Sequence, residues 1–378
     1  MKLEVPDSKQ VFILQSAKLS VSHLQDASML SVKRLQELLD RFPDLHVAVM
    51  GDFFLDRYLV SDPALDELSV ETGLVANQVV STRCSPGAAG TVTSNLSALG
   101  VGHVEAIGII GDDGEGFELL RGLHNRGVRT DHLFQVADRF TPTYMKPMRL
   151  KPDGSEVEQQ RIDIKNRTRL PRDAEQKLLD CVLTRLHMSL GDLPLDGLIF
   201  MDQVSEANCG SLTDHIRDTL CDMALRYPQV VVLADSRERI GQYHNINIKP
   251  NMVEALGALN HAHRGDVTPA QAQGFGRILA SHNNGRVYMT LGEQGIAVCD
   301  REHAELVDAV RVEGEVDIVG AGDSASAGIV AALCAGAKPS EAAELGTLCA
   351  AITVTKIGTT GTASPAELVE LCSHLNKK

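Results

Sequence analysis

The chain has 378 residues, of which 43% are hydrophobic, and its 50 acidic against 36 basic side chains give a formal charge of −14. This acidic balance, with no long basic run, argues against nucleic acid or an anionic membrane as a main partner. No stretch approaches about 18 uninterrupted apolar residues, so we expect neither a membrane span nor a signal peptide.

Eight cysteines are scattered along the chain without a Cys-x-x-Cys pair. Disulfide frameworks and zinc sites usually show paired spacings, so we expect free thiols in a reducing, cytoplasmic compartment.

Residues 1–44 are expected to form an N-terminal extension, followed by one domain over residues 45–378. Within the extension, residues 31–42 place their apolar side chains on one helical face behind Ser31, a favourable N-cap. This pattern predicts a helix used for packing or for subunit contact. Residues 47–52, VAVMGD, then predict a buried strand that ends in Gly-Asp.

From there, helix-like and strand-like segments alternate. Helices are expected over 90–100, 114–127 and 211–227, and strands over 103–110, 195–202, 229–235 and 286–292. This alternation predicts a doubly wound α/β domain, with a mostly parallel sheet covered by helices on both faces. Several of these strands end in Asp or Gly, which places polar groups at the carboxyl edge of the sheet, where ligands bind.

Two segments, at about 56–84 and 141–164, break the alternation. Both contain strand-like stretches, and the second includes Pro152-Asp153-Gly154, a strong hairpin turn. They predict a small β-lid over the ligand-binding edge.

The most informative stretch is DIVGAGDSASAG, residues 317–328. We expect a strand over 312–319, a glycine turn and a helix over 324–336. Gly320 and Gly322 allow a tight turn, and the first amides of the helix have no intrahelical partner, which makes the turn an anion hole. Asp323 would repel a phosphate but suits a general base that takes a proton from a hydroxyl. The stretch therefore predicts phosphoryl transfer to an alcohol.

Two other interpretations fit the same letters. Gly320-x-Gly322-x-x-Ala325 matches the loose dinucleotide fingerprint, which needs a second strand ending in an acid about 20 residues later. Residues 338–341 instead open another helix, for which we expect Ser340 as N-cap. A plain glycine turn capped by Asp323 is the other alternative.

Further motifs accompany this turn. In chain order they are Gly51-Asp52-x-x-x-Asp56-Arg57-Tyr58, Pro86-Gly87 through Asn95-Leu96 with Leu99-Gly100, Gly108-x-x-Gly111-Asp112-Asp113-x-x-Gly116, Gln160-Arg161-x-Asp163, Asp202, Asp235, Pro250-Asn251-x-x-Glu254, Thr290-x-Gly292-x-x-Gly295, Asp317 to Asp323 and Lys356-x-Gly358-Thr-x-Gly361. In this order and spacing the chain, from about residue 46 to 370, resembles the PfkB (ribokinase-like) carbohydrate kinases. Within them it is most similar to the heptose-7-phosphate kinase domain of the bifunctional heptose-phosphate kinase/adenylyltransferases.

The resemblance implies transfer of the ATP γ-phosphoryl group to a hydroxyl of a sugar or sugar phosphate, with Mg²⁺. Asp323 would be the base, and the amides of Gly320, Ala321 and Gly322 the anion hole. Asn251 and Glu254, at helical i, i+3 spacing, would face a magnesium-phosphate site, Glu254 through water. The alternative for this pair is a helix cap and a solvated acid. The remaining nucleotide contacts would be Thr290, Gly292, Gly295 and, on the adenine side, Thr347.

On the sugar side, the resemblance implies contacts from Asp52, Asp56, Gly87, Ala88, Thr91, Asn95 and Arg161. Asp56 as a loop cap and Arg161 as an ordinary lid charge are the alternatives. A monovalent cation, K⁺, would lie near Asp317 and Val319 and the 358–364 loop. The family also implies a homodimer formed through the lid.

The chain departs from the family pattern at four positions. Ala88 replaces a usual Gly, Thr91 an Asn, Val319 a Thr and Thr347 an Asn. The competing functions are a nucleoside kinase of the same fold and a non-catalytic sugar- or nucleotide-binding homologue. The absence of Trp and the low aromatic content, 4%, disfavour stacking on a nucleobase.

Overall fold

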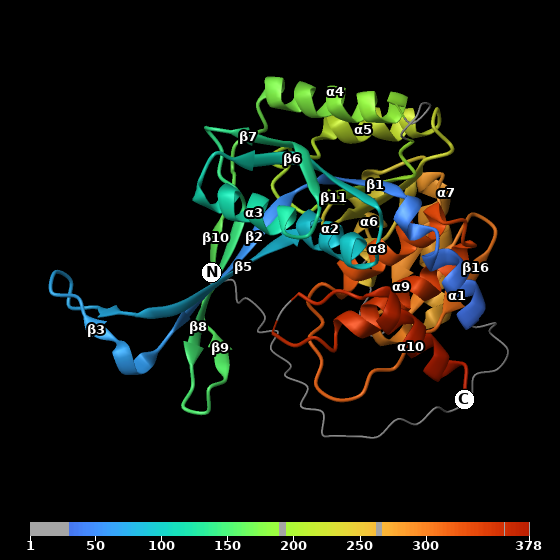
Figure 1. Ribbon diagram of the computed structural model, residues 1–378. Helices are drawn as coiled ribbons and strands as arrows, with labels where there is room; N and C mark the ends of the chain where they lie inside the picture. Colours follow the sequence, from blue (N-terminus) through green and yellow to red (C-terminus); the bar gives the residue numbers. More distant parts are fainter. Residues whose placement is uncertain (1–29, 189–193, 262–266, 359, 378) are drawn as a thin grey trace.

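The computed structural model describes residues 30–188, 194–261, 267–358 and 360–377, so residues 1–29 of the expected extension lie outside the described part. Its large sheet has nine strands in the order β16-β15-β14-β13-β12-β11-β1-β6-β7 (Figure 1). Neighbouring strands are parallel except β15, which is antiparallel to β14 and β16. The strands are β1 (His46–Gly51), β6 (His103–Gly111), β7 (Arg129–Val136), β11 (Gly197–Asp202), β12 (Val231–Ser236), β13 (Asn247–Ile248), β14 (Val287–Thr290), β15 (Ile296–Cys299) and β16 (Ala304–Val307).

Helices cover both faces of this sheet, because strand side chains alternate between them. Val47 and Val49 of β1 lie in one hydrophobic core, whereas Ala48 and Met50 lie in the other. The first face packs against α1 (Val32–Leu39), α2 (Ala89–Ala98), α3 (Gly114–His124), α8 (Ala321–Cys334), α9 (Pro339–Thr353) and α10 (Pro365–Leu375). The second packs against α4 (Arg172–Met188), α5 (Asp214–Ala224), α6 (Met252–Ala258) and α7 (Pro269–Asn283). The doubly wound prediction is confirmed.

A smaller sheet forms the lid, as expected, and its strands project from the body at the lower left of Figure 1. Its order is β10-β8-β2-β5, with β9 paired to β8 across the predicted Pro-Asp-Gly turn. The strands are β2 (Phe53–Ser61), β5 (Val79–Ala88), β8 (Thr143–Leu150), β9 (Glu156–Glu158) and β10 (Ile162–Ile164), and β3 (Glu67–Leu68) pairs with β4 (Val75–Ala76). Four short 3₁₀ helices are also described: η1 (Phe42–Asp44), η2 (Pro63–Leu65), η3 (Ile240–Gln242) and η4 (Gly292–Gln294).

The predicted helix near the start of the chain is present as α1, and Ser31 caps it by accepting from the Arg34 amide at 3.1 Å. Its apolar side chains, Leu35 and Leu38 among them, are fully buried in the core that also contains α9 and α10. Arg34 pairs with Glu341 at 3.1 Å. The helix is therefore a packing element of the body.

Two local predictions are wrong. Residues 312–319 form no strand: Gly314 turns the chain at φ 99°, and Ile318 and Val319 are exposed rather than paired. The apolar/acidic alternation there imitated a strand, but the sheet already ends at β16. The N-cap of α9 is Lys338, not Ser340, because Pro339 fits the first helical turn, where its missing N–H costs nothing.

No helix within the described residues is long and apolar enough to cross a membrane. All eight cysteines are free thiols.

Candidate active site

The order of the large sheet reverses between β1 and β11. From β1 the chain continues to β6 and β7 on one side, and β11 to β14 follow on the other. Such a switch point leaves a crevice outside the carboxyl ends of the strands, where ligands of open α/β sheets bind. Both α2 and α8 begin at this edge and pack against each other, with Thr91 of α2 close to Gly320.

Helix α8 presents free amides to the crevice. Gly320 caps it at φ 83°, and a side chain there would also meet Thr360, so this position requires glycine. The Ala321 amide is used within the turn, donating to the Ile318 carbonyl at 3.3 Å. Among the described residues, no acceptor pairs with the amides of Gly320, Gly322 or Asp323. The donors available to an anion therefore differ from the expected set, with the Asp323 amide in place of that of Ala321.

Asp323 lies in the first turn of α8 and is half-buried. Burial, followed by the negative charge of Asp235, raises the pKa of its carboxyl to about 7, against the opposing charges of Lys249 and Arg237. A carboxylate with a pKa near neutrality is suited to accept a proton at physiological pH. Asp56 of the sugar side also contributes to this shift, so the two predicted groups lie within electrostatic range of each other.

Lys249 is a site residue that the sequence analysis missed. It follows β13 with its ammonium almost fully buried, 2.8 Å from Asp235 at the end of β12. A side chain built on Gly322 would approach the Lys249 Nζ atom to 3.7 Å, so the ammonium lies next to the anion-binding turn. The sequence could have indicated Lys249, because it directly follows a buried strand and lies two residues before Asn251.

Most of the predicted nucleotide residues lie together after the ends of β13 and β14. Asn251 pairs with Thr290 as an isolated parallel bridge, and the Thr290 amide donates to the Pro250 carbonyl at 2.9 Å. Gly292 and Gly295 bound the turn η4 with φ of 59° and 99°. Thr347 lies apart in α9, buried, with its hydroxyl donated to the Glu344 carbonyl at 2.8 Å.

Asn251 and Glu254 form a reciprocal capping box at the start of α6. The Asn251 side chain accepts from the Glu254 amide at 2.9 Å, and the Glu254 Oε2 atom accepts from the Asn251 amide at 2.8 Å. The helix-cap alternative is therefore present in the structure, yet the Oε1 atom of Glu254 is outside this box.

Asn251 and Glu254 fit a Mg²⁺ ion only if water and substrate phosphates supply its other ligands. Burial, followed by the charge of Asp235, raises the pKa of Glu254, which shows acidic groups converging on this edge. The described residues contain no cluster of three or more His, Cys, Asp or Glu side chains able to hold a metal. Magnesium commonly keeps its waters and binds one or two carboxylates plus substrate phosphates, and that mode suits these residues.

On the lid side, Asp56 of β2 is buried and pairs with Lys146 of β8 at 3.3 Å. Burial raises the pKa of Asp56, opposed by the charges of Lys146 and Arg161. A side chain at Gly87 would come within 3.0 Å of the Asp56 carboxylate, so glycine keeps this acid accessible. Arg161 is exposed, bonds Asp163 at 2.6 Å and stacks 3.9 Å above the Tyr144 ring.

Ala88 adopts a strained backbone before α2, with φ 52° and ψ −118°. Residues with a Cβ rarely adopt a positive φ, which gives a physical reason for glycine at this place in the family pattern. Nearby, Thr91 and Asn95 are buried, and the Asn95 amide nitrogen donates to the Thr91 carbonyl at 2.9 Å. The Asn95 Oδ1 atom has no hydrogen-bond partner among the described residues.

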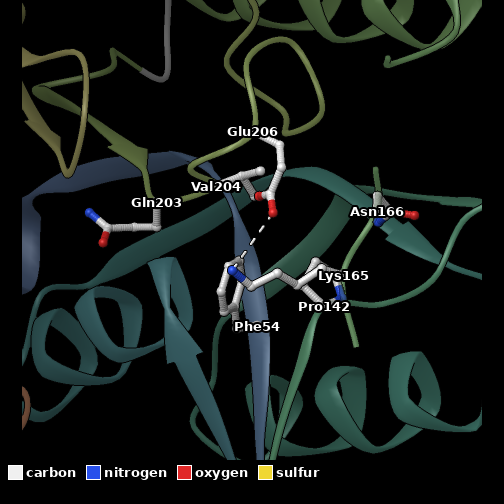
Figure 2. Close-up of a pocket in the computed structure, with 7 residues that line it drawn as sticks. All are labelled: Phe54, Pro142, Lys165, Asn166, Gln203, Val204 and Glu206. Carbon is white, nitrogen blue, oxygen red and sulfur yellow. Dashed lines mark ion pairs between the residues drawn. The ribbon is translucent and has the colours of Figure 1, made fainter. Parts of the chain in front are cut away.

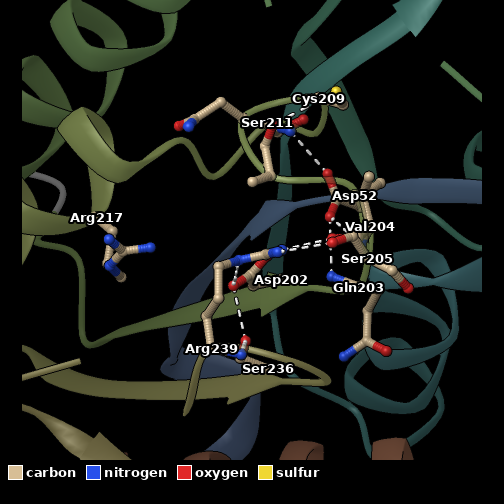
Figure 3. Close-up of polar contacts among 12 residues, drawn as sticks. Asp52, Asp202, Gln203, Val204, Ser205, Cys209, Ser211, Arg217, Ser236 and Arg239 are labelled. Carbon is tan, nitrogen blue, oxygen red and sulfur yellow. Dashed lines mark hydrogen bonds and ion pairs between the residues drawn. The ribbon is translucent and has the colours of Figure 1, made fainter. Parts of the chain in front are cut away.

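Asp52 has backbone partners that the sequence analysis did not predict. Its Oδ2 atom accepts from the amides of Gln203 and Val204 at 2.9 Å each, and its Oδ1 atom from the Ser211 amide at 2.7 Å (Figure 3). The residue is only 3% exposed, and these bonds fasten the loop after β11. Burial, followed by the charge of Asp202, raises the pKa of Asp52 to about 6.

A buried network holds the other side of the same loop. Asp202 pairs with Arg239, accepts from the Ser236 hydroxyl at 2.7 Å, and accepts from Tyr243 at 3.2 Å. Arg239 in turn donates to the Ser205 carbonyl at 3.1 Å, as Figure 3 shows beside Asp52. The loop is therefore anchored from β1 and from β12.

A small cavity lies where the lid meets this loop (Figure 2). Its volume is about 10 Å³, room for about one water molecule, which is far too little for a sugar. Lys165 and Glu206 close it with an ion pair at 3.9 Å. The open crevice, not this cavity, is the candidate site.

The region expected to bind a monovalent cation contains Asp317, Val319 and the Thr360 hydroxyl. The Asp317 Oδ1 atom accepts from the Val319 amide at 3.0 Å. The buried Thr360 hydroxyl has no partner among the described residues. Residue 359 of the accompanying loop lies outside the described part.

Comparison with known proteins gives a consistent result. The model of the pfkB family carbohydrate kinases matches residues 46–367. A protein named "Bifunctional protein HldE" from Pelobacter propionicus is 28% identical over 340 residues, which cover 89% of this chain and 65% of that protein. Its namesake from Magnetococcus marinus is 30% identical over 321 residues, covering 84% of this chain and 62% of that protein. The chain thus spans less than two thirds of these relatives.

Solved structures show the same fold. A putative phosphofructokinase from Staphylococcus aureus superposes with a TM-score of 0.65 at 21% identity, covering 86% of this chain and 96% of that chain. Phosphofructokinase-2 from Escherichia coli, in complex with fructose-6-phosphate, gives 0.66 at 17% identity, covering 88% and 99%. Ribokinase from Thermotoga maritima gives 0.61 at 18% identity, covering 87% and 99%.

Proposed function

The chain belongs to the pfkB family of carbohydrate kinases, and from this premise we propose that it transfers the γ-phosphoryl group of ATP to a hydroxyl of a sugar or sugar phosphate. One observation carries the proposal: a carboxyl with a pKa of about 7, Asp323, lies in the same helical turn as unpaired backbone amides. A protein that only binds its ligands has no need of a base beside an anion hole.

The proposed step is an in-line displacement. The Asp323 carboxylate takes the proton of the acceptor hydroxyl as that oxygen bonds to the γ-phosphorus. The bond from this phosphorus to the β–γ bridging oxygen breaks, and ADP leaves. The free amides of Gly320 and Gly322 donate to the oxygens of the transferring group, where negative charge must be stabilised.

Thr290 and the η4 turn would lie along the nucleotide phosphates, and Asn251 and Glu254 would hold magnesium through water. When bound, the ion would neutralise phosphate charge. Thr347 is a weaker candidate for adenine contact, because its hydroxyl is already bonded.

The acceptor would bind between α2 and the lid. Asp56 offers a buried carboxylate for sugar hydroxyls, and Asn95 an unpaired carbonyl oxygen. Arg161, stacked on Tyr144, and Lys146 are cations near Asp56 that suit an acceptor carrying a phosphate. The predicted sugar contact of Asp52 remains a proposal, alongside its three bonds to backbone amides.

Two wider features complete the proposal. Eight free thiols suit a reducing compartment such as the cytoplasm. A homodimer formed through the lid would cover the apolar side chains that the lid exposes.

The test is magnesium-dependent ADP release by the purified protein across sugars, sugar phosphates and nucleosides. We expect turnover with a sugar or sugar phosphate, and a loss of at least about 100-fold in kcat for Asp323→Asn, with ATP binding little changed. Asp222→Asn, a change of the same chemistry at an exposed position on α5, is the matched control and should behave as wild type.

Other outcomes would replace the proposal. Turnover restricted to nucleosides would favour the nucleoside kinase. ATP binding without turnover on any acceptor, indifferent to Asp323→Asn, would favour a non-catalytic homologue.

A further inference from the structure

A buried ion pair lies next to the turn that carries the proposed base. The Lys249 Nζ atom is 2.8 Å from the Asp235 Oδ2 atom, and the two side chains are 4% and 9% exposed. The backbone holds the pair in register, because the Lys249 amide donates to the Ala234 carbonyl at 2.9 Å. The pair therefore has a fixed geometry, set by β12 and the end of β13.

Stability alone is a poor reason for such a pair. Removing two charges from water costs about as much as their attraction returns, so well-packed apolar side chains at the same place are often equally stable. The location of the pair points to another reason. Its ammonium lies next to Gly322, in the turn that would receive phosphate oxygens.

Asp235 also holds α8 itself. Its Oδ2 atom accepts from the Ser326 hydroxyl at 3.1 Å as well as from Lys249. Ser326 lies three residues after Asp323, so both project from the same side of the helix. A second contact reaches Asp235 from the loop after β11, where the Gln203 Nε2 atom lies 3.5 Å from Oδ1.

We propose that the Asp235–Lys249 pair positions Asp323. The pair holds α8 to the sheet edge at Ser326, about one turn along from Asp323, and sets the charge that the base experiences. This inference rests on the proposed function, since it assigns a task within that site. Neither residue is assigned contact with the acceptor hydroxyl.

The charged groups facing Asp323 come from several elements. Asp235 and Arg237 come from β12 and the loop after it, Lys249 follows β13, and Asp56 lies in β2. Removing the negative charge of Asp235 favours the ionised form of the base, whereas removing the positive charge of Lys249 disfavours it. The two single substitutions should therefore act in opposite directions.

The experiment measures kcat/KM against pH for wild type, Lys249→Met and Asp235→Asn. The base must be ionised, so wild-type kcat/KM should rise through a midpoint near pH 7. We expect Lys249→Met to move this midpoint up by about one pH unit, and Asp235→Asn to move it down by a similar amount. Lys249→Arg, which keeps the charge, should retain the wild-type midpoint.

A merely structural pair would lower kcat and the melting temperature in both variants and leave the midpoint where it is. That result, or two shifts in the same direction, would overturn the inference. If Lys249→Met does not fold because Asp235 is left unpaired, the double variant Asp235→Asn/Lys249→Met removes both charges. Its midpoint should lie above that of Asp235→Asn alone, and equality of the two would also overturn it.

A second readout needs no turnover. The ¹³C-carboxyl signal of Asp323, assigned by its loss in Asp323→Asn, can be titrated in the nucleotide-free protein. The same order of midpoints is expected, with Asp235→Asn lowest and Lys249→Met highest. A different order of titration midpoints refutes the positioning role. If the order holds but no acceptor in the panel is phosphorylated, only the proposed function is refuted.

Discussion

Single residues at this site carry tasks that their position in a motif did not reveal. Ala88 and Asp52 belong to motifs from which the resemblance implied substrate contacts. In the structure, Ala88 bears backbone strain at φ 52°, and Asp52 binds three amides. Residue identity and spacing could locate both at the sheet edge, but backbone angles and hydrogen-bond partners arise only when distant segments meet.

The strain at Ala88 leads to a prediction about stability. Ala88→Gly removes the Cβ that disfavours this backbone conformation, so we expect the free energy of unfolding to rise by about 1 kcal/mol. Urea unfolding measures it. Ala98→Gly, at the last position of the same helix, is the control and should lose about 0.5–1 kcal/mol.

Ala88→Gly should also change the specificity for the sugar acceptor. Removing the methyl group beside the acceptor crevice should widen the range of sugars that are phosphorylated, which the acceptor panel would show. A less stable Ala88→Gly protein would contradict the strain argument.

At the scale of the elements, the sequence predicted β6 as a strand but did not predict the buried polar contacts of its Glu105. The strand was expected over 103–110 and spans His103–Gly111. Its Glu105 is 1% exposed and bonded by His46 at 3.1 Å, by Arg185 of α4 at 3.0 Å and by His132 of β7. The sequence predicted a strand here, but only sheet order and the packing of α4 bring these partners together.

Substitution of Glu105 in this cluster should cause a large loss of folding stability. Burial by itself would raise the pKa of Glu105, but the bonds from His46 and His132 and the charge of Arg185 hold it at about 2, below its ordinary 4.5. That depression corresponds to about 3 kcal/mol of folding stability at neutral pH. Glu105→Gln should therefore lower the free energy of unfolding by about 3 kcal/mol or more, because it also leaves Arg185 unpaired. Glu37→Gln, in an exposed pair on α1, should change it little.

The pH dependence has a definite sign. Because the folded-state pKa is depressed, the contribution of Glu105 is complete above about pH 4.5 and is lost as the pH falls towards 2. Wild type should lose more stability than Glu105→Gln across that window. Parallel curves for the two proteins would refute the assignment.

At the scale of the whole molecule, the lid has an unpaired strand edge and exposed apolar side chains. Strand β5 ends the lid sheet, so its outer edge is unpaired within it. Exposed apolar side chains gather on the lid: Leu65, Leu68, Val70, Leu74, Val75, Val79, Val80, Val157 and Ile162. An open edge strand among apolar side chains favours association.

We therefore expect a dimer in sedimentation velocity, held by the lid. The double substitution Leu74→Lys/Val80→Lys should shift it to monomer, because charges of like sign would face each other in the contact. Leu225→Lys, equally apolar and exposed but located after α5, should leave the assembly unchanged. A monomeric wild type at micromolar concentration would exclude the lid dimer.

By itself, the sequence determined the fold class, the lid and the place of Asp323. Hydrophobic periodicity and glycine turns are local signals, and they sufficed for much of the α/β alternation and for Asp323 at a helix N-terminus. They left α4, α7 and β7 unpredicted. The apparent strand over 312–319 failed because an alternating pattern does not say whether a partner strand exists. Only the tertiary structure decided which amides stay free, that Asp52 fastens a loop, and that Lys249 lies buried next to the Gly322 turn. These depend on contacts between residues tens to hundreds of positions apart, which local sequence does not specify.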